Sequence, residues 1–174
     1  MPTYDRTTVL FHWIIGFAVL AQFALGWWML DIPKDASGTR AWWFNLHKSI
    51  GLSLVVLVVV RLLWRLAHPA PLPPGALPRA QRIAATATHW ALYGCMLVMP
   101  LSGYLGSSFT RYPIRYFGAT LPHWGWDWPA GKAAMSALHA ATAWTLGVLV
   151  ALHIAAALWH LVRRDGLFSR MWPA

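Results

Sequence analysis

The sequence predicts an all-α protein, an integral membrane bundle of four transmembrane helices. Of its 174 residues, 58% are hydrophobic and only 11% are charged, which is too apolar for a water-soluble domain of this size. Four apolar stretches are each long enough to cross a bilayer, which takes roughly 20 helical residues. Most of the 13 tryptophans lie at the ends of these stretches, where membrane interfaces favour them.

The four predicted spans cover residues 9–30, 46–64, 83–109 and 133–162. The first is too long for the apolar core of a cleaved signal peptide and carries His12, so we expect it to remain as a helix. The third contains Pro100, which should kink or break its outer end. The connections are a polar turn at 31–45, a proline-rich stretch at 69–78 and an aromatic loop at 110–132. With no repeat or second domain visible, residues 1–174 are expected to form a single transmembrane domain.

The lysines and arginines predict the orientation of the bundle. Eight lie on the side shared by both termini and the second connection, whereas six lie on the other side. This excess places both termini in the cytoplasm. The net charge of +9 does not indicate nucleic acid, because the basic residues flank apolar spans instead of forming a soluble basic face. Anionic lipid headgroups are the expected partner.

Histidines inside the spans are the strongest functional signal. His139 and His153 are 14 residues apart in the last span, which returns them to nearly one helix face, about 21 Å apart along the axis. Ionisable side chains within a membrane are costly and usually functional, so each histidine calls for a partner at its own depth. His47 opens the second span at the outer depth and His12 opens the first at the inner depth. Depth therefore pairs His47 with His139 and His12 with His153.

Two imidazole pairs at two depths fit two stacked haems. An iron with two imidazole ligands has no open position for oxygen and suits electron transfer. Cys95 is the only cysteine, so covalent haem attachment through C-x-x-C-H is excluded and any haem is b-type. Gly16 and Gly51 each follow a candidate ligand by four residues, where a missing side chain would let a flat porphyrin lie against the helix.

Other interpretations of these residues remain open. A lone membrane histidine more often bonds a neighbouring helix or relays protons than binds a metal, and glycines are common at helix contacts. Histidine pairs also bind zinc or copper, but no carboxylate lies in the spans and the pairs are too far apart to form one site. A colourless transporter or scaffold is therefore the non-redox alternative.

Short motifs add a resemblance that runs over nearly the whole chain. They are R-x-x-x-x-x-H-W at 6–13, H-K-S-I-G at 47–51, R-L-L-W-R at 61–65, T-H-W-A-L-Y at 88–93 and H-x13-H at 139–153. In order and spacing this set resembles the bacterial cytochrome b561 family, di-haem membrane cytochromes b of the superoxide oxidase type. The same H-x13-H helix also occurs in cytochrome b subunits of formate dehydrogenases and nickel–iron hydrogenases.

The resemblance implies a four-helix protein of the bacterial inner membrane that holds two haem b groups and exchanges electrons with ubiquinone. Members of the family have been assigned superoxide oxidase activity, in which superoxide is oxidised to oxygen at the outer surface and ubiquinone is reduced. His47 and His139 would then ligate the outer haem, and His12 and His153 the inner one. Lys48 and Lys132 would attract superoxide, since both flank the outer haem helices.

The same resemblance suggests where ubiquinone and the haem propionates bind. The quinone candidates are the inner histidines His89 and His160 and the aromatic residues Trp90 and Trp159. Arg61 and Arg82 are the candidate propionate contacts, although bonding of His89 to a propionate and extension of the arginines to headgroups are equally open. The alternative function is an electron-transfer subunit that anchors a dehydrogenase or hydrogenase, which would require a redox partner protein.

Overall fold

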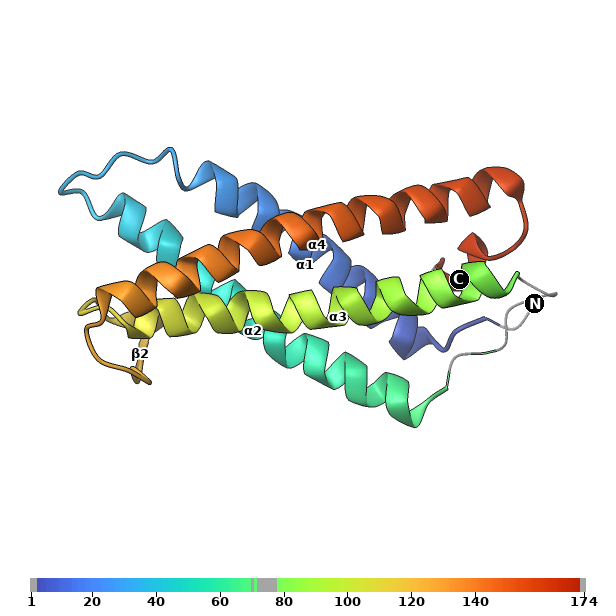
Figure 1. Cartoon of the computed structure of the whole chain (residues 1–174), viewed down its shortest axis with the longest axis horizontal. Helices are drawn as coiled ribbons and strands as arrows, with labels where there is room; N and C mark the ends of the chain where they lie inside the picture. The colour runs from blue at the N-terminus through green and yellow to red at the C-terminus, as the bar shows by residue number, and fades with distance from the viewer. Residues whose placement is uncertain (1–2, 70, 72–77, 173–174) are drawn as a thin grey trace.

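A computed structural model describes residues 3–69, 71 and 78–172 (Figure 1). It contains four long helices: α1 (Arg6–Trp28), α2 (Thr39–Ala67), α3 (Arg79–Ser108) and α4 (Pro129–Arg163). A two-stranded antiparallel hairpin, β1 (Ile114–Tyr116) and β2 (Ala119–Leu121), precedes α4, and a short 3-10 helix, η1 (Phe168–Met171), follows it. The predicted all-α class with four helices is thus confirmed.

The helices form an elongated bundle. Helix α1 packs against α2, α2 against α3, and α3 against α4. The first and last described residues lie at one end of the bundle, together with the start of α3, whereas the hairpin lies at the other end (Figure 1). We call these the inner and outer ends.

Helices α2 and α4 extend beyond both predicted bounds, whereas α1 and α3 begin three or four residues earlier and end one or two residues earlier than predicted. Helix α2 begins at Thr39, within the stretch expected to be a polar turn, and α4 begins at Pro129, a residue whose fixed φ suits the first helical position. Of the kink or break predicted at Pro100, the break is wrong, because α3 continues to Ser108. A proline removes only one hydrogen bond of the helix, and packing against α2 and α4 maintains the rest. Most of the proline-rich stretch at 69–78 lies outside the described residues.

Three of the described helices, α1, α2 and α4, are long and apolar enough to cross a membrane. Their side chains support this conclusion: Phe17 is 63% exposed, Val56 61% and Trp144 68%, as expected of surfaces covered by lipid. Helix α3 is comparable in length at 30 residues but does not meet the same criterion. Polar residues such as Arg79 and Arg82 in its first turn lower its apolar content. The chain is a multi-pass membrane protein, and the fourth span remains a prediction.

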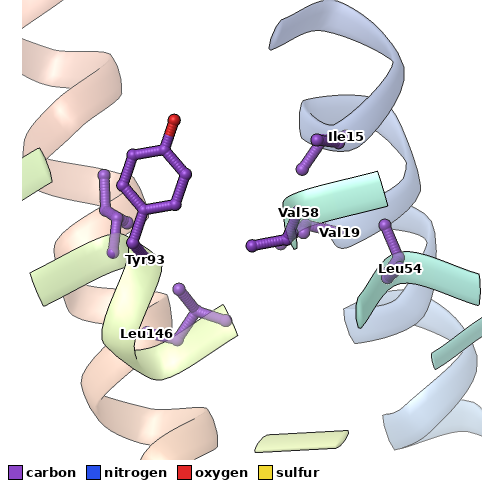
Figure 2. Packing of buried hydrophobic residues seen from close by; sticks show 7 residues of the cluster. Ile15, Val19, Leu54, Val58, Tyr93 and Leu146 are labelled. Carbon is purple, nitrogen blue, oxygen red and sulfur yellow. The ribbon is translucent and has the colours of Figure 1, made fainter. Parts of the chain in front are cut away.

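All four helices contribute to the buried core. Figure 2 shows Val19 and Val58 on one side of this core and Leu146 on the other. In α1 the core residues lie between His12 and Gln22. In α4, Leu146 lies midway between His139 and His153. An apolar layer therefore separates the two levels of histidine. Its buried members are Ile15, Val19, Leu54, Val58, Leu92, Tyr93 and Leu146.

The hairpin, which the sequence analysis treated as part of an aromatic loop, is attached to α2 by hydroxyl groups. Its turn places Phe117 and Gly118 at φ angles of +45° and +96°, the left-handed values that a two-residue hairpin turn requires. The Ser49 hydroxyl, on a residue only 1% exposed, donates to the Asn45 carbonyl (2.7 Å) and accepts from the Phe117 amide (2.9 Å). These bonds hold Ile114, which is fully buried, over the outer end of the bundle.

Replacing Ser49 with alanine is expected to destabilise this attachment. The part-buried Phe117 amide would lose its acceptor, and a typical hydrogen bond of this kind contributes about 0.5–1.5 kcal/mol. Thermal unfolding of the detergent-solubilised protein should show a lower midpoint. Ser107→Ala is the matched control, because its hydroxyl bonds only the Gly103 carbonyl of the same helix. An equal midpoint for the two variants would show that the hairpin is held by other contacts.

Candidate functional site

The outer histidine pair faces a cavity between the helices. The ring centres of His47, near the start of α2, and His139, in α4, lie 6.3 Å apart. Both rings line a cavity of about 400 Å³, a volume typical of small-molecule and cofactor pockets. The cavity is largely apolar and receives residues from all four helices.

A backbone carbonyl beside His139 fixes which nitrogen of its ring carries the proton. Nδ1 lies 2.7 Å from the Met99 carbonyl oxygen, which can only accept, so Nδ1 carries the proton and Nε2 keeps a free lone pair. This is the state in which an imidazole can bind a metal through Nε2. A Cβ added at Gly103 would lie 3.2 Å from the ring, so glycine at this position lets the imidazole approach α3.

Two glycines that the sequence analysis did not single out contact the outer rings. A Cβ at Gly26 would lie 3.4 Å from His47, and Gly103 contacts His139. At Gly51 an added Cβ would instead meet the amide of Gln22 at 3.3 Å, and at Gly16 it would meet nothing within 4 Å. The sequence analysis missed Gly26 and Gly103 because each lies on a different helix from the histidine it contacts. No spacing along one helix could have indicated them.

The inner level brings together histidines from three helices. The ring centre of His153 lies 5.9 Å from that of His12 and 5.4 Å from that of His89. Nδ1 of His89 donates to the Ala85 carbonyl at 2.6 Å. Nδ1 of His12 lies 3.3 Å from the Arg61 guanidinium, which can only donate, so this nitrogen accepts.

Both predicted pairs fit an iron with two axial imidazoles. Metal–imidazole bonds are about 2 Å long, which puts two ring centres that share one metal roughly 6 Å apart. The observed separations of 6.3 and 5.9 Å match this span. At the outer level the two imidazoles also face an apolar cavity, and Nδ1 of His139 is already bonded to a carbonyl, which forms a donor set suited to haem iron. The residues present therefore fit the group.

A cluster of two arginines and a tyrosine adjoins the inner histidines. The guanidinium groups of Arg61 and Arg65 lie 5.5 and 5.8 Å from the ring centre of Tyr93. Nε of Arg61 and the hydroxyl of Tyr93 are buried and have no hydrogen-bond partner in the part of the chain that the structure describes. In Figure 2 this hydroxyl points away from Leu146. Such a set of donors suits an anionic group with acceptor oxygens. The other candidate, Arg82, is exposed in the first turn of α3.

The second quinone candidate, His160, lies in a separate cluster at the end of α4. Its Nδ1 is 2.6 Å from a carboxylate oxygen of Asp165, and its ring packs edge-on against Trp159 at 4.9 Å. The hydrogen bond from His160 holds the pKa of the Asp165 carboxyl below its usual value. The guanidinium carbon of Arg163 lies over the Trp159 ring, 4.6 Å from the ring centre. Trp90 is half exposed and lies 6.1 Å from Tyr93. The structure thus places His89 beside His153 and His160 beside Asp165.

The outer end carries positive charge near the cavity. Lys48 lines the cavity beside His47 and interacts electrostatically with Lys132. Arg111 is neutralised by Asp127, 2.5 Å away. Within the described ranges, neither Lys48 nor Lys132 forms an ion pair with a carboxylate. These two lysines therefore leave an uncompensated positive charge at the outer side.

Comparisons with known proteins give matches over nearly the whole chain. A family model described as prokaryotic cytochrome b561 matches residues 3–174. The chain is 37% identical over 180 residues to cytochrome b561 homolog 2 of Escherichia coli strain K12, covering 97% of this chain and 90% of that protein. It is 26% identical over 184 residues to the probable superoxide oxidase CybB of Yersinia pestis, covering 98% and 96%. Both similarities extend over nearly the full length.

Proposed function

Because this chain belongs to the prokaryotic cytochrome b561 family, we propose that it is a di-haem cytochrome that transfers electrons from superoxide to ubiquinone across the membrane. Membership implies haem b and electron transport in a multi-pass membrane protein. One observation carries the rest of the proposal. Two histidine pairs, with ring centres 6.3 and 5.9 Å apart, lie on opposite sides of one apolar core.

In this proposal His47 and His139 hold the outer haem, and His12 and His153 hold the inner one. When bound, each haem supplies a one-electron carrier with no open iron position. The protein contributes the ligands, their orientation and the exclusion of water. All four helices would cross the bilayer, including α3, which packs between α2 and α4, and both termini would lie in the cytoplasm.

The reaction balances as two superoxide anions and one ubiquinone plus two protons giving two oxygen molecules and one ubiquinol. Superoxide gives up one electron at a time, which suits a one-electron carrier. Lys48 and Lys132 would attract the anion to the outer haem, because their charges are not neutralised by carboxylates of the described chain. The name of the Yersinia pestis relative supports this choice of donor.

At the inner end, Arg61 and Tyr93 would receive a haem propionate. In the structure Arg61 donates to Nδ1 of His12, which leaves the proton of that ring on Nε2. Iron binding through Nε2 therefore requires Arg61 to turn to another acceptor, and a propionate carboxylate is the strongest one expected nearby. The unpartnered Nε of Arg61 and hydroxyl of Tyr93 are suited to the same group.

Ubiquinone reduction also needs protons from the inner side. His160 and Asp165 form a hydrogen-bonded pair in which neither side chain is fully buried, so it can exchange protons with water. We assign to it proton delivery to a quinone that packs beside Trp159. His89, which bonds Ala85 and faces His153, is the alternative quinone contact.

An absorption spectrum with a pyridine haemochrome assay tests the proposal. Purified protein is expected to contain two b haems per chain that are reduced both by dithionite and by a superoxide source. Colourless protein after haem-supplemented expression would contradict the haem assignment. Haems that respond to dithionite but not to superoxide would instead favour a subunit that takes electrons from a dehydrogenase or hydrogenase partner.

A further inference from the structure

Two buried polar atoms near the outer cavity lack hydrogen-bond partners within the described residues, and they complement each other. One is Nδ1 of His47 and the other is Oε1 of Gln22. Both side chains line the cavity, His47 from α2 and Gln22 from α1. The two residues are already joined, because Nε2 of Gln22 donates to the backbone carbonyl of His47 at 2.8 Å.

His139, the other member of the outer pair, forms the hydrogen bond at Nδ1 that His47 lacks within the described residues. Nδ1 of His139 donates to the Met99 carbonyl, which fixes both the proton and the rotation of the ring. His47 needs the same arrangement to present Nε2 to a metal, since its Nδ1 must then carry a proton and that proton needs an acceptor. An amide oxygen is such an acceptor, and a buried one without a donor is costly.

We propose that Gln22 is the positioning residue for His47: its Oε1 accepts a hydrogen bond from Nδ1 of His47, while its Nε2 stays bonded to the His47 carbonyl. This inference rests on the proposed role of His47 as an axial ligand of the outer haem. One amide would then fix the ring at two points. As an acceptor on the far side of the imidazole, it would also increase the electron donation of the ring to the iron.

The glycine on α2 supports this role independently. A Cβ added at Gly51 would lie 3.3 Å from Nε2 of Gln22, closer than ordinary van der Waals contact. Glycine one turn after His47 therefore leaves room for the glutamine amide to lie against α2. The absence of a side chain at Gly51 therefore lets the Gln22 amide lie beside the His47 ring that it would orient.

The test is a redox titration of the purified holoprotein, with the outer haem identified by its loss in His47→Ala. Gln22→Met keeps the length of the side chain but removes the amide, so the midpoint potential of the outer haem should rise and its low-spin ferric EPR signal should shift. Gln22→Glu keeps an acceptor oxygen whether or not it is ionised, so the potential should stay at or below the wild-type value. The inner haem should not change in either variant.

The same substitution at Gln81, an exposed residue in the first turn of α3, is the matched control and should shift neither haem. Should Gln22→Met not assemble, Gln22→Asn, which shortens the amide by one methylene, replaces it and should also raise the potential. Unchanged outer potential and EPR signal in a fully loaded variant would overturn the inference, as would equal shifts of both haems. Absence of the outer haem from the wild type would instead refute the proposed function.

Discussion

Alanine in place of His139 is expected to remove one of the two haems and to leave the other spectroscopically intact. The Met99 carbonyl and Gly103 hold the His139 ring in place on its Nδ1 side, and an alanine there carries no nitrogen that could bind the iron. His47→Ala should have the same effect, because the two rings face one another across 6.3 Å. The haemochrome assay should fall from two haems per chain to one.

The reciprocal variants at the inner level should remove the other haem. His12→Ala and His153→Ala are expected to leave the outer haem reducible while stopping electron transfer to ubiquinone. His68→Ala serves as the control, since this exposed ring stacks on Trp64 at the end of α2 and should change neither haem. If His89→Ala removed the inner haem and His12→Ala did not, the inner ligand pair would be His89 and His153.

Reversing the charge of Lys48 together with that of Lys132 is expected to slow the reduction of the haems by superoxide. Electrostatic attraction raises association rates by roughly 10- to 1000-fold, so Lys48→Glu with Lys132→Glu should lower the rate at least about tenfold. The attraction should also weaken with ionic strength in the wild type, because salt screens exposed charges over about 10 Å at 0.1 M. Stopped-flow absorbance with a superoxide source measures both effects.

Two controls distinguish a loss of electrostatic attraction for superoxide from damage to the haem site. Dithionite should reduce the double variant fully, and its haem content should remain at two per chain. Arg111→Gln together with Asp127→Asn removes both charges of one ion pair and keeps the net charge, so it should leave the superoxide rate nearly unchanged. A double variant that retains the wild-type rate and salt dependence would exclude these lysines from anion attraction.

Helical periodicity explains why the histidine pairs could be predicted from the sequence. His139 and His153 share one long helix, so their spacing alone fixes their relative face and depth. His12 and His47 lie near the starts of α1 and α2, and the lengths of the spans set their levels. The structure places these four rings in two close pairs, whereas their role as ligands remains a prediction.

Contacts between helices could not be predicted in this way. The histidine rings or backbones are contacted or hydrogen-bonded from other helices by Gly26, Gly103, Met99 and Gln22. Such contacts depend on how one helix is rotated against another, which packing sets and spacing along the chain does not. The hairpin was missed for a related reason. Its strands are three residues each, and Ser49 of α2, 68 residues before Phe117, completes its hydrogen bonds.

The apolar layer between the two histidine levels has a consequence for membrane energetics. Among the buried members of this layer only Tyr93 carries a side-chain donor or acceptor, and a single hydroxyl does not form a chain along which a proton could move between the two levels. In the proposed reaction an electron crosses this layer inward, while the matching proton is taken from the cytoplasm. Each turnover would then make the cytoplasmic side more negative. Moving one electron inward costs about 2.3 kcal/mol for every 100 mV of membrane potential, inside negative, that already exists. Removal of superoxide would thus be electrogenic and would help to charge the membrane.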